Sequence, residues 1–253
     1  MVKYLLIFFG VLILSKGEYA QGASGFPALE NQDEQLSSRK KVDPSGKNYL
    51  EIAKNYTNNG KFDLAKKYLD LASQSEDANI YEEVLIWDIY NDSLQGKKDL
   101  NNKLDQIMGD AYAKALYFAA DGWQTYFNNN PEAEEIGNLS RDYRERLIAQ
   151  FPDSNWADLS SIHLVPLFIN DKEYDSALFY LLKYFEKMKS GNLSEGDRAW
   201  YYLAVIMEKS EEHKDLDKAI KAYQKVITYP DSMFAVQSRK KIIEIENLYF
   251  ITR

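Results

Sequence analysis

The sequence contains no cysteine, only two histidines, and few prolines (6) and glycines (12) among its 253 residues. The absence of cysteine excludes disulfides, thiolate metal ligands, a cysteine nucleophile and the lipid-modified cysteine that anchors bacterial lipoproteins. The scarcity of proline and glycine favours long helices over strands and turns. The net charge of −8 argues against nucleic acid or anionic lipid as a partner, because both bind basic surfaces.

The sequence also lacks the motifs of common active sites. It has no G-x-S-x-G, no glycine-rich phosphate loop and no H-E-x-x-H. His163 lies between apolar residues, which is typical of a satisfied packing or surface histidine, and His213 lies in a charged turn and is expected to be solvated. We therefore predict no catalytic residue, no cofactor, no metal and no enzymatic activity. A glycosidase with scattered carboxylates on a helical scaffold is the remaining enzyme alternative.

The first 22 residues have the pattern of a cleaved secretory signal peptide. Lys3 precedes an apolar run from Tyr4 to Leu14, and the small residues Ala20 and Gly22 follow. The run is too short to span a bilayer core of about 30 Å, so a retained anchor is the weaker alternative. Residues 23–45 are rich in Ser, Gly, Asn and charge and read as a flexible leader. This pattern predicts a periplasmic or secreted protein.

Two segments share one helical-hairpin pattern, in which aromatic, aliphatic and small residues recur at helical spacing and alanines lie where two helices approach. The first segment has Tyr49, Ile52, Ala53 and Tyr56, then Gly60, then Ala65, Leu69 and Ala72; the second has Trp200, Leu203, Ala204 and Met207, then Ala219, Tyr223 and Pro230.

A shorter motif also occurs twice, as Phe151-Pro-Asp-Ser-Asn-Trp-Ala157 and Tyr229-Pro-Asp-Ser-Met-Phe-Ala235. Proline ends one helix, and Asp or Ser caps the next by accepting hydrogen bonds from its first N–H groups. The separation of the two copies leaves room for one complete hairpin, which Leu164, Phe168, Ala177 and Leu181 indicate.

The remaining segments predict further helices. The middle has a helix over residues 80–90, a partner helix through Leu100, Leu104 and Ile107, and a long helix over 110–127, after which Pro131 opens the next helix. The end has helices over 216–227 and 233–249, the last with a polar face at Arg239, Lys240 and Lys241 that is typical of a terminal cap.

These patterns resemble tetratricopeptide repeats, directly over residues 46–77 and 158–235. The aromatic-Pro-Asp-Ser motif resembles the variant in bacterial envelope proteins, such as outer-membrane assembly lipoproteins of the BamD type and the periplasmic coordinators of the Tol–Pal system. The resemblance implies an all-α fold over residues 46–253, a right-handed α-solenoid of about 10–11 helices in antiparallel hairpins. It also implies a non-catalytic scaffold or assembly factor of the cell envelope that binds a protein or peptide and contacts membranes only through that partner.

First-helix positions outside the seam of each hairpin are expected to line the concave face and to form an apolar, mildly basic groove for a peptide. The alternative is that these side chains pack on further helices. They are Leu50, Lys54, Ile162, Pro166, Tyr201 and Val205. A second functional hypothesis is a carbohydrate- or peptidoglycan-binding module, in which aromatic rings stack on sugars.

Overall fold

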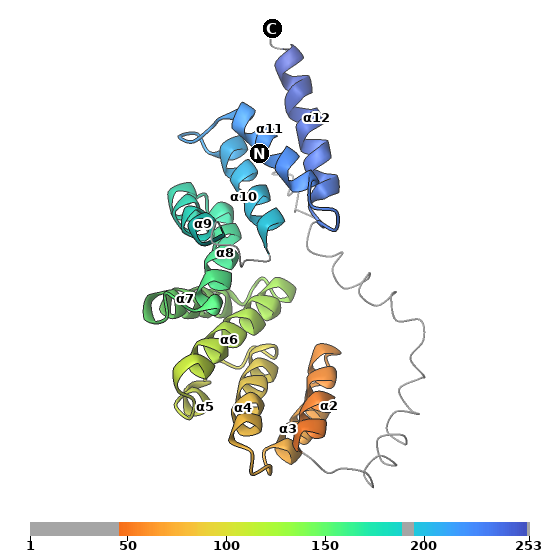
Figure 1. Ribbon diagram of the computed structural model, residues 1–253, viewed down its shortest axis with the longest axis vertical. Helices are drawn as coiled ribbons and strands as arrows, with labels where there is room; N and C mark the ends of the chain where they lie inside the picture. The colour runs from red at the N-terminus through yellow and green to blue at the C-terminus, as the bar shows by residue number, and fades with distance from the viewer. Residues whose placement is uncertain (1–45, 189–194, 252–253) are drawn as a thin grey trace, which may run out of the picture.

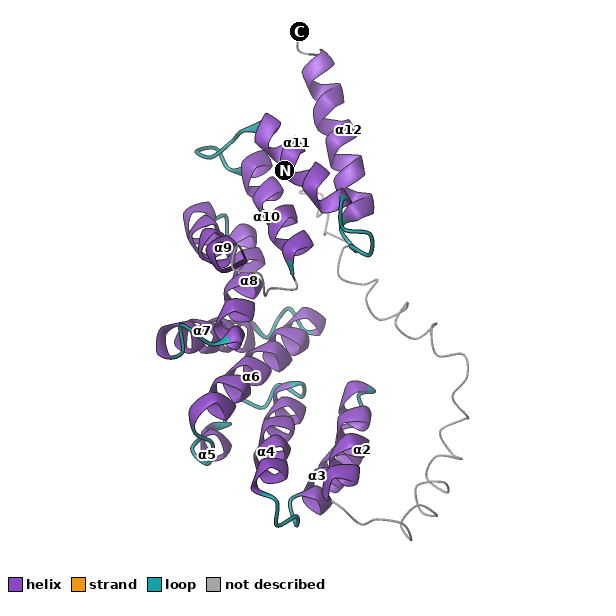
Figure 2. Ribbon diagram, in the orientation of Figure 1, coloured by secondary structure: helices purple, strands orange, loops and turns teal. Residues whose placement is uncertain are grey.

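The computed structural model of the chain describes residues 46–188 and 195–251, and every regular element in these ranges is an α-helix (Figures 1 and 2). The predicted signal peptide (1–22) and leader (23–45) lie outside the described residues. No helix in the described part is both long enough and apolar enough to cross a bilayer. In chain order the helices are α2 (Gly46–Asn58), α3 (Phe62–Ala72), α4 (Ala78–Ser93), α5 (Asn101–Leu104), α6 (Gly109–Asn129), α7 (Glu134–Gln150), α8 (Asn155–Asn170), α9 (Tyr174–Met188), α10 (Gly196–Lys209), α11 (Leu216–Ile227) and α12 (Ala235–Ile251).

The helices pair into hairpins that stack along the long axis of the molecule (Figure 1). The hairpins are α2 with α3, α6 with α7, α8 with α9, and α10 with α11. The first helices α2, α4, α6, α8 and α10 contact one another in succession, and we call them the row of first helices. The predicted all-α, tetratricopeptide-like solenoid is thereby confirmed for the described residues.

Alanines lie where the two helices of a hairpin are in contact. Ala53 on α2 and Ala65 on α3 have no exposed surface, and neither have Ala204 on α10 and Ala219 on α11. A larger side chain at any of these positions would overpack the contact. The turn after α2 also follows the sequence pattern, because Gly60 has a φ of +70°, which glycine adopts without strain.

Both aromatic-Pro-Asp-Ser motifs lie between helices and end in a serine that receives a backbone hydrogen bond. The Ser154 hydroxyl oxygen accepts from the N–H of Ala157 at 3.1 Å and caps α8. The Ser232 hydroxyl oxygen accepts from the N–H of Phe234 at 3.2 Å, directly before α12. The predicted capping role of the motif is confirmed for Ser154, whereas Ser232 binds an N–H that precedes α12.

The middle of the chain departs from the sequence prediction in two places. The expected partner helix through Leu104 and Ile107 is a single turn, α5, so α4 packs against α6 instead. Pro131 does not open α7, which begins at Glu134, because the N–H of Ala133 donates to the carbonyl of Asn130 and closes a separate turn.

Ion pairs join the short α5 to α4, in addition to the packing of Leu104 in the core. The ammonium of Lys103 on α5 lies 2.7 Å from Asp88 and also contacts Asp92, both on α4. Lys66 on α3 approaches Asp88 to 3.0 Å, and Lys97 approaches Asp92 to 2.6 Å. Burial alone would raise the pKa of Asp92, but hydrogen bonds from Lys103 and Lys97 bring it below its ordinary value.

The direct contact of α4 with α6 depends on the absence of a side chain at Gly122. A Cβ at Gly122 would lie 2.8 Å from the Cβ of Ser93 and 3.1 Å from the backbone nitrogen of Leu94. The neighbouring Trp123 is fully buried and donates its indole N–H to the carbonyl of Lys97 at 2.8 Å. A side chain at position 122 would therefore collide with Ser93 at the end of α4.

The last helix, α12, is in contact with α11 and is joined to α10 by a hydrogen bond. Its outer face is not fully polar, unlike that of the predicted terminal cap. Glu208 of α10 accepts hydrogen bonds from Lys241 of α12 at 2.9 Å and from the Tyr223 hydroxyl at 2.6 Å. Val236 and Ile243 are exposed on α12 beside the predicted polar side chains. The polar face at residues 239–241 is thus interrupted by apolar positions.

Substitution of Gly122 by alanine tests this close approach. Alanine favours a helix over glycine by about 1 kcal/mol, yet overpacking costs about 1–3 kcal/mol, so we expect the free energy of unfolding to fall. Chemical denaturation of Gly122→Ala, Ser93→Gly and the double variant measures the coupling. The double variant should recover part of the loss; a Gly122→Ala protein more stable than the parent would contradict the close contact.

Candidate partner-binding surface

The row of first helices buries four of the six side chains predicted to line a groove. Ile162 has no exposed surface, Leu50 exposes 4%, and Tyr201 and Val205 expose 8% each. The cause is packing, since successive first helices press on one another and the Phe234 ring stacks on Tyr201 with centroids 4.6 Å apart. For these four positions the structure favours the packing alternative.

The other two predicted residues, Lys54 on α2 and Pro166 on α8, are half-buried, and their contact with a partner stays a prediction. The ammonium of Lys54 lies 2.8 Å from Glu51 and 3.9 Å from Glu83 on α4, and 5.6 Å from the centre of the Trp87 ring. Through Glu83, the Lys54 side chain is thus adjacent to a pocket that α4 helps to form.

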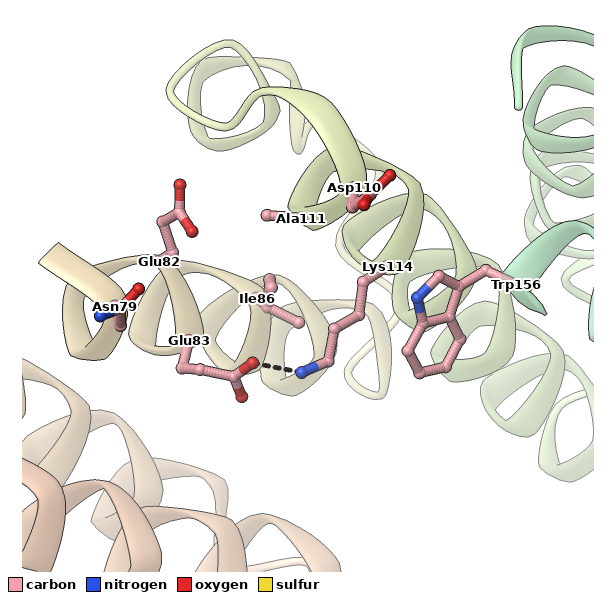
Figure 3. A pocket seen from close by; sticks show the side chains of 8 residues that line it. All are labelled: Asn79, Glu82, Glu83, Ile86, Asp110, Ala111, Lys114 and Trp156. Carbon is pink, nitrogen blue, oxygen red and sulfur yellow. Dashed lines mark hydrogen bonds and ion pairs between the residues drawn. The ribbon is translucent and has the colours of Figure 1, made fainter. Parts of the chain in front are cut away.

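This pocket lies on the row of first helices between α4 and α6, with one wall from α8 (Figure 3). Its volume is about 250 Å³. Ion pairing between Glu83 and Lys114 spans it, and Ile86 forms an apolar patch at its centre. It is lined by Asn79, Glu82, Glu83, Ile86, Asp110, Ala111, Lys114 and Trp156.

The pocket is acidic and aromatic rather than apolar and mildly basic. Glu82 and Asp110 are exposed, and neither has an ion-pair partner among the described residues. Trp156 is held by ring contacts with Tyr117 at 5.1 Å and Phe118 at 5.9 Å between centroids. The carboxylates of Glu82 and Asp110 can form ion pairs with a cationic side chain, and the indole ring of Trp156 can form a cation–π contact with it.

A second polar cluster continues along the row, from α6 to α10. Arg144 of α7 is 1% exposed, and its guanidinium lies 3.6 Å from Asp121 of α6. Its Nε and Nη1 have no hydrogen-bond partner among the residues that the structure describes. The Arg144 guanidinium also lies 5.7 Å from the centre of the Tyr117 ring. Burial, together with the negative charge of Asp121, raises the pKa of Tyr117 to about 12, so its hydroxyl stays protonated.

His163 occupies the centre of this cluster. Arg198 donates from Nη1 to His163 Nε2 at 2.9 Å, because a guanidinium has no acceptor to offer. The imidazole proton must then lie on Nδ1, which is 3.9 Å from Asp121. Burial and the positive charges of Arg144 and Arg198 lower the pKa of His163 well below its ordinary value. The prediction of a satisfied histidine is confirmed by the hydrogen bond from Arg198.

The environment of the other histidine, His213, differs from the predicted one. His213 is half-buried, and its Nε2 lies 2.6 Å from Asp175 on α9. The two residues are 38 positions apart in sequence, and no local pattern signals their contact. The pocket was missed for the same reason, since Glu82, Asp110 and Trp156 come from three separate helices; only Trp156 lay in a motif that the sequence analysis identified.

Residues 198–232, which form most of α10, all of α11 and the turn after it, match the family model of the tetratricopeptide repeat. This segment is therefore similar to a tetratricopeptide repeat. Among curated proteins, none matches the sequence. Tetratricopeptide repeats generally mediate contacts between proteins, and their stacks present a continuous surface for this purpose. The repeat and the helical stack together support a protein-interaction scaffold.

The low pKa of His163 predicts a pH dependence of stability. In the unfolded chain a histidine has a pKa near 6.5, so protonation favours unfolding. This contribution to stability is complete above about pH 6.5 and is lost progressively as the pH falls below that value toward the folded pKa. The loss on going from about pH 7.5 to 5.5 should be smaller in His163→Gln, measured by denaturant unfolding.

Nuclear magnetic resonance of a His213→Gln variant, in which His163 is the remaining imidazole, follows the same group directly. We expect the pKa of the ring to lie below that of a free imidazole, so that it titrates at a lower pH than an exposed histidine does. A titration centred near pH 6.5 would contradict the buried contact with Arg198.

Proposed function

We propose that this protein is a non-catalytic adaptor of the bacterial cell envelope that holds a protein or peptide partner on its row of first helices. The observation that carries the proposal is the pocket between α4, α6 and α8, where side chains from three successive helices of the row converge on an open surface. Solenoids use this kind of extended, multi-repeat surface to bind other chains.

The size of the pocket favours a side chain of a larger partner over a small-molecule ligand. Sites for small molecules usually enclose about 300–1,000 Å³, whereas this pocket is smaller and open. One long side chain fits such a volume, with the rest of the peptide lying along the row. The carboxylates of Glu82 and Asp110 and the Trp156 ring favour a lysine or arginine side chain.

The proposed location in the envelope rests on the sequence. Residues 1–22 have the charge, apolar core and small residues of a cleaved signal peptide, and the aromatic-Pro-Asp-Ser motif resembles that of envelope proteins. The absence of cysteine suits an exported protein that folds by packing alone. A role in assembly or coordination at the outer membrane is part of the same proposal.

Reversal of the two rim charges tests the role of the pocket. We expect Glu82→Lys with Asp110→Lys to weaken binding of the partner about tenfold or more, a change of about 1.4 kcal/mol, by repelling its basic side chain. The partner is captured from envelope extract, identified, purified and titrated by calorimetry. The matched control, Asp142→Lys with Glu186→Lys, makes the same charge change at exposed positions of the second helices α7 and α9.

The control pair should leave the affinity within about twofold of the parent. If both pairs of substitutions weaken the affinity equally, or if neither pair changes it, the partner binds elsewhere on the molecule. Binding to purified cell-wall glycan with no retained protein would instead establish the alternative, a carbohydrate-binding module in which Trp156 stacks on a sugar.

A further inference from the structure

The turn between α10 and α11 is longer than the turn of the first hairpin and carries side chains that the proposed function does not use. It comprises residues 210–215, whereas the turn between α2 and α3 comprises residues 59–61. The extension includes Glu212 and His213. It reaches back along the stack to the first turn of α9, where it meets Asp175.

Three metal-binding groups converge at this contact. His213 Nε2 lies 2.6 Å from the Asp175 Oδ1, and the carboxylate of Glu212 completes a group whose ligand atoms all lie within 4.8 Å of one another. Asp175 and Glu212 are exposed, so an ion can reach them, while His213 is half-buried. Glu212 and His213 come from one turn and Asp175 from the neighbouring hairpin.

The turn that carries two of these groups is held by hydrogen bonds of its own. The N–H of His213 donates to the Ser210 hydroxyl at 3.1 Å, and the N–H of Asp215 donates to the carbonyl of Met207 at 2.9 Å. Asp215 also caps α11 by accepting from the N–H of Lys218 at 2.9 Å. The backbone of the turn that carries Glu212 and His213 is thereby ordered before an ion binds. The loss of conformational entropy on metal binding is therefore smaller.

The donor set selects a class of ion. One imidazole nitrogen and two carboxylate oxygens suit zinc and similar first-row divalent ions, which bind such atoms at about 2.0–2.2 Å. Two carboxylates and a neutral imidazole carry a charge of −2, which a divalent cation neutralises. Small rotations of the exposed Asp175 and Glu212 side chains bring three donors around one ion, and water fills the open position.

We propose that Asp175, Glu212 and His213 form a binding site for a divalent first-row transition metal ion, zinc being the leading case. The bound ion joins the α10–α11 turn to the start of α9 and so staples two successive hairpins. Because the site lies outside the row of first helices, it is independent of the proposed partner surface.

The test is a titration of the chelator-treated full chain with Zn²⁺ alone, by calorimetry, with Co²⁺ absorption as a second probe of the ligand geometry. We expect one Zn²⁺ per chain and a rise in Tm, because the ion binds the folded state. Loss of an outer-shell partner weakens metal binding about 10–100-fold, so His213→Gln, Asp175→Asn and Glu212→Gln should each weaken it at least about tenfold.

Two matched controls separate this site from adventitious binding. Glu211→Gln removes a neighbouring carboxylate that is not in the cluster, and His163→Gln removes the other histidine of the chain. Both should keep the parental affinity and the Tm rise. Absence of Zn²⁺ binding, binding unchanged in His213→Gln, or equal weakening in Glu211→Gln would each overturn the proposal.

Discussion

The close contact of helices through alanine and glycine is the constraint on which this structure depends. A helical hairpin of this length cannot bury its apolar stripe alone, so it must stack, and stacking requires positions where no bulky side chain separates the backbones. Ala65, Ala204 and Ala219 provide these positions within the hairpins, and Gly122 provides one between α4 and α6. Large rings such as Trp123 and Tyr223 fill the spaces beside them and are fully buried.

The same constraint determines where chemistry can occur on the surface. Since successive first helices are in direct contact, most of their apolar side chains are buried between helices, as Ile162 and Leu50 are. Charged side chains such as Glu82 and Asp110 stay exposed on these helices, and the shortened α5 leaves α4 and α6 side by side around the pocket. The acidic pocket with its tryptophan wall is therefore a consequence of the direct contact between α4 and α6, rather than a feature of the repeat itself.

Sequence reasoning predicted those features that local periodicity and helix-end chemistry control. The helix over 216–227, the buried alanines and the Ser154 cap all follow from patterns within a few residues. Reasoning from local pattern was wrong for the length of α5, a single turn, although Leu100, Leu104 and Ile107 are buried in the core as their spacing indicates. It also missed the contact of His213 with Asp175 and the pocket, since both depend on which hairpins become neighbours.

The most direct measurement of the central constraint compares one substitution at two alanines. In Ala219→Leu the larger side chain must enter the fully buried contact of α10 with α11, while in Ala149→Leu it extends from an exposed position on α7. Denaturant unfolding should show a loss of about 1–3 kcal/mol for Ala219→Leu and a change within about 0.5 kcal/mol for Ala149→Leu. Equal stabilities of the two variants would contradict the view that small residues hold the helices in contact.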